Sequence, residues 1–128
     1  MHLSKSISVL FLIIFLGCNQ QSQQYDATTI EVSSPVDIGD VPLGIAHRFT
    51  ISIVNTGQNP MQIGDVMVPC TCTVPTWEKA AIDPNENTEI SIEFTPGDLG
   101  FFQEEIMVTG NFESTYVKLT GNVLLQNY

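Results

Sequence analysis

The feature that most constrains the fold is an alternation of apolar and polar side chains with a period of two, which begins at Thr28 and recurs to the end of the chain. Residues 45–53, 89–94 and 101–108 show it most clearly. Because successive side chains of a strand point to opposite faces, this period predicts half-buried β-strands. Turn-forming residues interrupt the pattern about every eight to twelve positions. We count about seven short strands and no helical period, so the sequence predicts an all-β, Ig-like sandwich over residues 28–128.

A more local prediction concerns residues 61–74. The apolar positions shift by one residue across Gly64-Asp65, which predicts a β-bulge beside the glycine. Beyond the shift, the pattern predicts one continuous strand that carries both cysteines of the domain on one face. The side chains on that face are Val66, Val68, Cys70, Cys72 and Val74. A long connection is then expected from Pro75 to Asn87.

The front of the chain has the composition of an export signal. Lys5 precedes an apolar run, Ile7–Leu16, and the small residue Gly17 follows it directly before Cys18. This order of charge, apolar run and small residue is that of a secretory signal peptide. The run of ten residues is too short for a transmembrane helix, which needs about 20 apolar residues.

The end of this signal, Phe15-Leu16-Gly17-Cys18, resembles the bacterial lipobox, in which the cysteine is acylated and becomes the first residue of the mature protein. The resemblance implies a lipid on Cys18, and two or more acyl chains anchor a protein stably at a membrane. We therefore predict a signal peptide at 1–17, an acylated cysteine and polar flexible tether at 18–27, and a sandwich domain at 28–128. The predicted location is the bacterial cell envelope, on its periplasmic or surface face.

The net charge narrows the range of partners. Without the signal, the basic side chains are Arg48, Lys79 and Lys118 against 14 acidic ones, a formal charge of −11. A domain this acidic repels nucleic acid, and its attachment to a membrane must depend on the lipid rather than on electrostatics. No small-molecule substrate is indicated. The expected partners are the membrane, through Cys18, and other envelope proteins.

Cys70 and Cys72 are the two sulfurs left for chemistry in the domain. Residues two apart in a regular strand have α-carbons about 6.6 Å apart, whereas a disulfide usually spans about 5.5–6 Å. A direct bridge therefore needs a bend, which the β-branched Thr71 makes harder. A strained bridge of this kind would be easily reduced, which favours a redox use. Plain structural thiols are a second interpretation that the residues leave open.

Two thiolates on one face also suit a soft metal, with copper or zinc as the leading cofactors. Accessory ligands would have to come from Met61, Met67 or His47, although methionines in strands are more often core residues. Conventional catalysis is not expected, because a Ser-His-Asp set would depend on His47 alone. We therefore predict no catalytic residues and no enzymatic activity.

Several motifs carry a resemblance to a known family. They are Val36-Asp-Ile-Gly-Asp-Val-Pro-Leu-Gly44, Phe49-Thr-Ile-Ser-Ile-Val-Asn-Thr-Gly57, Pro60-Met-Gln-Ile-Gly-Asp-Val66, Ile82-Asp-Pro84 and Val117-Lys-Leu-Thr-Gly-Asn-Val123. Together they resemble the bacterial domain-of-unknown-function family 1573, whose members are similar to the Ig-like ASH/MSP/hydin sandwiches. The family's Ser-Cys-Gly-Cys-Thr element corresponds to Pro69-Cys-Thr-Cys-Thr73. The resemblance implies a sandwich fold and an envelope location, and no established activity.

Two hypotheses for the function follow. The first is a non-enzymatic, lipid-anchored module that binds envelope proteins or scaffolds an assembly through strand edges and end loops. The second is a metal-handling or thiol-redox lipoprotein that uses Cys70 and Cys72. Thiol titration together with metal analysis would discriminate between them, because the second requires reactive thiols or a bound metal.

Overall fold

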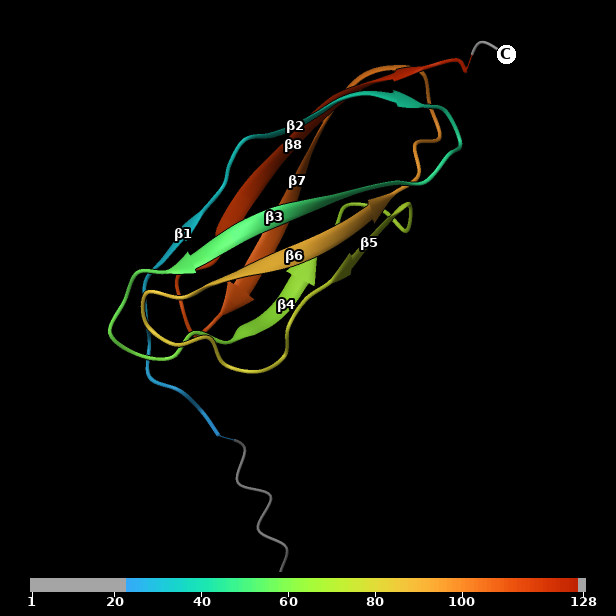
Figure 1. Cartoon of the computed structure of the whole chain (residues 1–128). Coiled ribbons are helices and arrows are strands. Elements are labelled where there is room, and N and C mark those ends of the chain that lie inside the picture. The colour runs from blue at the N-terminus through green and yellow to red at the C-terminus, as the bar shows by residue number, and fades with distance from the viewer. Residues whose placement is uncertain (1–22, 127–128) are drawn as a thin grey trace, which may run out of the picture.

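The computed structural model describes residues 23–126, which form two packed β-sheets and no helix (Figure 1). The eight strands of this region are β1 (Ile30–Val32), β2 (Val36–Pro42), β3 (His47–Asn55), β4 (Ile63–Met67), β5 (Thr73–Thr76), β6 (Asn87–Phe94), β7 (Gly100–Gly110) and β8 (Thr115–Leu124). The all-β sandwich predicted from the sequence is thus confirmed, with one strand more than the count of about seven.

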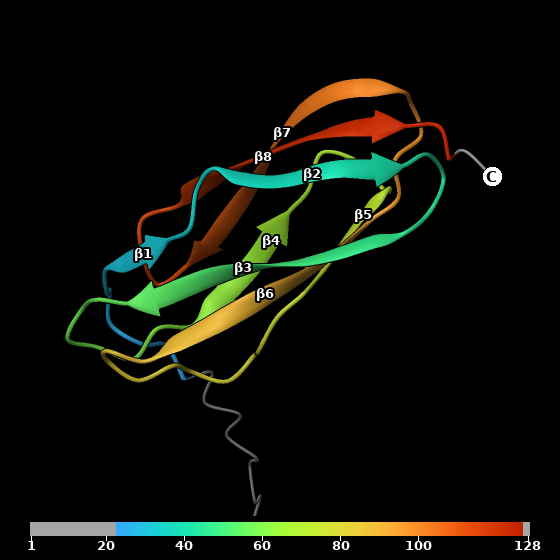
Figure 2. The same cartoon turned by 45° about the horizontal axis from the view of Figure 1, so that its top comes forward.

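The strands form two four-stranded sheets, in the orders β1-β3-β6-β5 and β2-β8-β7-β4. Neighbouring strands are antiparallel except β2 and β8, which run parallel. Figure 2 shows β3 and β6 of one sheet lying in front of β4 of the other sheet. The chain changes sheet at five connections, β1–β2, β2–β3, β3–β4, β4–β5 and β6–β7. The crossover between β4 and β5 carries the two cysteines.

The core lies between the sheets and consists of the side chains that the period-two pattern places inward. Its fully buried members include Ile51, Ile53, Ile90, Ile92, Ile106, Val108, Val117 and Leu119. β8 keeps this alternation through Gly121, where a β-carbon would lie 2.7 Å from the ring of Phe102. The glycine therefore makes room for an aromatic ring on the neighbouring strand rather than kinking β8.

The predicted β-bulge is present, since the pairing of β4 with β7 shifts between Ile63 and Asp65. The single continuous strand that the sequence pattern predicted as far as Val74 is not present in the described residues. β4 ends at Met67, and the next strand, β5, belongs to the other sheet. The sequence did not reveal β5 because it is four residues long and contains Pro75, which is tolerated there because β5 is an edge strand.

Two asparagines hold the end of the sandwich where the described chain enters. The fully buried Asn55 accepts a hydrogen bond from the hydroxyl of Thr28 (2.9 Å) and donates one to the carbonyl of Ile82 (2.9 Å). Asn111 donates to the carbonyl of Asp26 (2.7 Å). In Figure 1 the chain enters near the end of β3, whereas the β4–β5 crossover lies toward the opposite end.

The predicted signal peptide and Cys18 lie outside the described residues. Across residues 23–126, no helix is long and apolar enough to cross a membrane.

Candidate functional site

The crossover between β4 and β5 forms a tight turn in which a disulfide joins Cys70 to Cys72. The N–H of Thr73 donates a hydrogen bond to the carbonyl of Cys70 (3.3 Å), and the N–H of Thr95 donates to the carbonyl of Cys72 (2.9 Å). The two α-carbons lie 5.2 Å apart, slightly below the commonest separation but within the range of about 4.4–6.8 Å that disulfides span. The turn therefore supplies the bend that a bridge between residues two apart requires.

The prediction that both cysteines lie on one face of a regular strand is wrong. Residues 68–72 belong to no strand, so the spacing of about 6.6 Å that an extended backbone imposes does not apply to them. Pro69 helps to end the pairing, because proline has no N–H to donate to a sheet. Of the interpretations that the sequence left open, the structure contains the bridged form.

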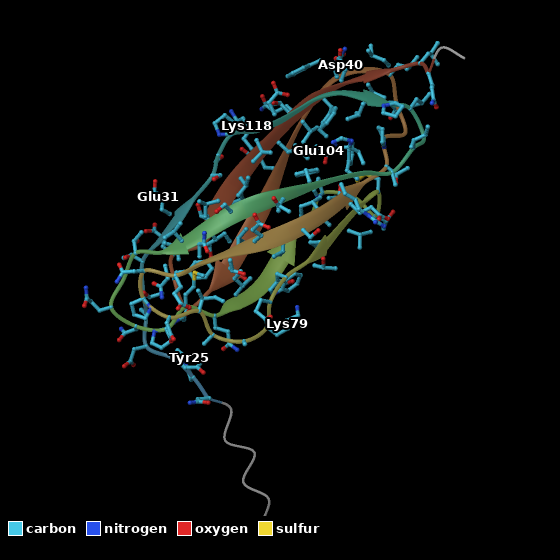
Figure 3. The ribbon with its side chains drawn as sticks, viewed as in Figure 1. Tyr25, Glu31, Asp40, Lys79, Glu104 and Lys118 are labelled. Atoms are coloured by element: carbon cyan, nitrogen blue, oxygen red, sulfur yellow. A yellow bond between two sulfur atoms is a disulfide. The ribbon has the colours of Figure 1, made fainter. Side chains whose placement is uncertain are left out.

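The side chain of Glu104 comes from β7 and lies beside the disulfide; Figure 3 labels it. One carboxylate oxygen of Glu104 and the sulfur atoms of Cys70 and Cys72 all lie within 4.8 Å of one another. The Oε2 atom of Glu104 is buried and has no hydrogen-bond partner among the described residues. Burial raises the pKa of Glu104 above its ordinary value, because desolvation disfavours the charged carboxylate.

Thr73 completes the inner side of the site. Its side chain is only 2% exposed, and its hydroxyl oxygen lies 3.7 Å from each of the two sulfurs. Cys70 and Cys72 are themselves half-buried, and Thr71 between them is exposed. The disulfide therefore faces solvent in part, while a buried hydroxyl and a half-buried carboxyl approach it from the protein.

The other residues singled out as accessory ligands lie apart from this group. His47 is half-buried at the start of β3, with its ring centroid 6.5 Å from that of Phe49, and it is not among the donor atoms that converge on the disulfide. Met61 is fully buried in the core. Met67 is 47% exposed and pairs with Met107 on the outer face of its sheet. Cys18 lies outside the described residues.

The sequence pattern placed Glu104 on one face with Phe102, Ile106 and Val108 but did not single it out as functional. Adjacent residues of a strand point to opposite faces, and accordingly Glu104 is half-buried whereas Glu105 is exposed. The available signal was an acidic residue on an apolar strand face, because carboxyl groups with perturbed pKa values concentrate at functional sites.

This arrangement suits thiol–disulfide exchange. A partly exposed disulfide can be attacked by a thiolate, and a carboxyl group nearby can give or take the proton that the sulfurs must exchange. Copper or zinc would bind thiolates rather than a disulfide, so binding of either metal would first require reduction of the bridge.

The fold alone is enough to assign the structural class of this protein. The first two strands, β1 and β2, belong to different four-stranded sheets, and the two sheets form a PapD-like and Ig-like sandwich. Residues 28–123 match the family described as "Protein of unknown function (DUF1573)", and the chain belongs to that family. The family resemblance indicated by the sequence motifs is therefore confirmed. The matched range includes the disulfide turn and Glu104. A comparison with curated protein sequences gives no match.

Three solved structures illustrate the likeness in fold. A protein of unknown function from Porphyromonas gingivalis W83 is 18% identical with a TM-score of 0.66, over 76% of this chain and 47% of that one. The ASH/PapD-like domain 7 of human CEP192 is 11% identical with a TM-score of 0.59, over 99% and 100%. The secreted serine protease VesC from Vibrio cholerae is 9% identical with a TM-score of 0.59, over 76% and 23%. The chain thus spans less than half of the first and about a quarter of the last, and at these identities the likeness concerns the fold alone.

Proposed function

We propose that this chain is a lipid-anchored protein of the bacterial cell envelope that exchanges the Cys70–Cys72 disulfide with thiols of a partner protein. The observation that carries the proposal is a partly exposed disulfide held in a tight turn beside the half-buried carboxyl of Glu104. The exchange is stoichiometric and requires no enzymatic turnover of a substrate.

The contribution of the bridge to the fold supports a redox use over a structural one. The disulfide closes a loop of only three residues, and the entropic stabilisation from a disulfide falls as the closed loop shortens. The core of the sandwich consists of aliphatic side chains from both sheets and does not include the two cysteines. A bridge that contributes little to stability can open and close without unfolding the domain.

The position of the turn supports a partner-facing role. The described chain enters the sandwich beside Asn55 and Asn111, and the disulfide turn lies toward the opposite end of the strands (Figure 1). An acylated Cys18 would therefore hold the disulfide turn away from the membrane surface, where soluble domains of envelope proteins can approach it. An exported domain also experiences an oxidising environment, in which a cysteine pair is expected to be bridged.

The test uses the full-length protein expressed in a bacterial host with its signal peptide. Single Cys70→Ser and Cys72→Ser variants leave one thiol that cannot resolve a mixed disulfide, so either variant should form a covalent adduct that a reductant releases. The matched control is the double variant, which should form none. The proposal fails if neither single variant forms more adduct than the double variant does. Mass spectrometry of the same preparations checks the lipid on Cys18, and an unmodified secreted chain would contradict the anchoring.

A second candidate function, a protein-binding or scaffolding module, is favoured by exposed apolar side chains near the same end of the sandwich. Ile45 between β2 and β3, Leu99 between β6 and β7, and Phe101 at the start of β7 are 43%, 55% and 72% exposed. Such side chains can anchor a protein contact. Leu99→Ser and Phe101→Ser should weaken capture of envelope proteins in both redox states if binding is the main function. Unchanged capture by both variants would count against this function.

A further inference from the structure

The contacts of Glu104 do not explain why a carboxyl group lies inside the sandwich. It occupies an inward position of β7, between the inward residues Phe102 and Ile106, and its neighbour on β8 is Leu119. A buried polar atom without a hydrogen-bond partner is destabilising and calls for a specific explanation. The disulfide turn lies beside it, and the hydroxyl oxygen of Thr73 is 3.7 Å from each of the two sulfurs.

We propose that Glu104 is the proton donor and acceptor for the sulfurs of Cys70 and Cys72 during thiol–disulfide exchange. This inference rests on the proposed redox function and assigns a further residue to it. The carboxylate oxygen lies within 4.8 Å of both sulfurs, so whichever sulfur leaves is near the acid. A rotation of the side chain or one bridging water closes the remaining gap to hydrogen-bond distance.

Reduction by a protein dithiol takes two exchange steps. A thiolate of the partner attacks one cysteine sulfur, a new S–S bond forms, and the Cys70–Cys72 bond breaks with its electron pair on the other sulfur. That leaving sulfur takes the proton of the Glu104 carboxyl group. The carboxylate then accepts the proton of the partner's second thiol, which attacks the mixed disulfide and releases the remaining cysteine, protonated by solvent. The chain's disulfide is reduced, and the partner's dithiol is oxidised to a disulfide.

The surroundings of Glu104 leave its proton available for this role. No other Asp, Glu or His of the described residues joins the group formed by the carboxylate oxygen and the two sulfurs. His47 lies on β3, in the facing sheet, and is not part of this group of donor atoms. Within residues 23–126 the ion pair found is Arg48–Glu93, which lies on the surface. With desolvation as the cause, the raised pKa of Glu104 keeps the group protonated to higher pH than an exposed glutamate.

The test measures the rate at which dithiothreitol reduces the oxidised full-length protein as a function of pH, corrected for the thiolate fraction of the reductant. We compare the wild type with Glu104→Gln. The matched control is Glu105→Gln, which changes an exposed carboxyl group on the same strand. At pH values below the pKa of Glu104, we expect Glu104→Gln to be slower by about tenfold, which is modest for positioned proton transfer because a thiolate is already a fair leaving group. The deficit should disappear as the pH rises through that pKa, and Glu105→Gln should behave as the wild type.

Two outcomes separate this inference from the proposed function. If the wild type is reduced and reoxidised but Glu104→Gln reacts at the wild-type rate at low pH, then the redox function stands and the role of Glu104 is refuted. A carboxylate that merely repelled the incoming thiolate would make Glu104→Gln faster at high pH and unchanged at low pH, which also refutes proton donation. If Glu104→Gln does not fold, the wild-type rate in D₂O replaces it: slowing at low pH is expected, and no slowing refutes the proposal.

Discussion

Removal of the Cys70–Cys72 disulfide should leave the sandwich folded. The perturbation is the double variant Cys70→Ser/Cys72→Ser, compared with the wild type in its oxidised and reduced states. The bridge closes a loop of three residues, for which the chain-entropy relation gives about 1.6 kcal/mol at room temperature, against about 3 kcal/mol for a loop of 15 residues. The variant should therefore lose at most about 1.6 kcal/mol of unfolding free energy.

The structure shows why other terms should not enlarge this loss. The turn keeps its hydrogen bonds from the N–H groups of Thr73 and Thr95 to the cysteine carbonyls, since these involve backbone atoms only. The core residues that dominate the stability, such as Ile51 and Ile90, lie between the sheets and are fully buried. Truncation of one such isoleucine to alanine costs about 2–5 kcal/mol, more than the whole disulfide.

The assay is equilibrium unfolding in urea, followed by circular dichroism and by tryptophan fluorescence from Trp77. We expect coincident, cooperative transitions for all three forms, with midpoints for the double variant and the reduced wild type that agree and lie slightly below that of the oxidised wild type. In thermal unfolding, the corresponding shift is at most about 10 °C for a domain of this size. A loss of more than about 3 kcal/mol, or an unfolded reduced protein, would show that the bridge is structural and would refute the reasoning.

Three further predictions test the account at other positions. Asn55→Ala should cost about 2–4 kcal/mol in urea unfolding, because it removes the hydrogen bonds of a fully buried side chain and leaves the hydroxyl of Thr28 and the N–H of Gly57 without their acceptor; a loss below about 0.5 kcal/mol would contradict this. Gly121→Ala should destabilise through contact with the ring of Phe102, and adding Phe102→Leu should recover part of the loss; an additive double variant would argue against the contact. Because the pKa of Glu104 is raised in the folded state, the contribution of this carboxyl group to the free energy of unfolding favours the fold at acidic pH and is lost as the pH rises through that pKa. Glu104→Gln should therefore match the wild type in acid and be more stable at neutral pH, and equal stability at both would contradict the burial of that carboxyl.

The sandwich was predictable because the sequence encodes it redundantly. The inward residues of β3, β6 and β7 alternate without error, and each of these strands has at least seven residues, so the period of two is unmistakable. Even the bulge at Gly64-Asp65 left a trace, as a one-residue shift in the apolar positions. In contrast, β5 has four residues and includes Pro75, which is too short a pattern to separate from a loop.

The candidate site was only half predictable. The Cys-x-Cys spacing identified the sulfurs, but their geometry depends on a turn held by Thr73 and Thr95, and Thr95 is 23 residues beyond Cys72. No local sequence pattern predicts a hydrogen bond between two segments that lie so far apart in the chain. The approach of Glu104 to the sulfurs likewise depends on how the crossover lies against β7, which is a property of packing between sheets rather than of either segment.

The most direct test of the central claim is the redox equilibrium of the Cys70–Cys72 pair in the purified full-length protein. The protein is incubated in buffers of reduced and oxidised glutathione, quenched with an alkylating agent, and the alkylated fraction is measured by mass spectrometry. Structural disulfides of secreted proteins usually have potentials below about −300 mV and resist the glutathione pool. We predict a reversible transition within the glutathione range, above that limit, with the fold retained in both states. A pair that stays fully oxidised throughout would contradict the claim that this disulfide is the working part of the molecule.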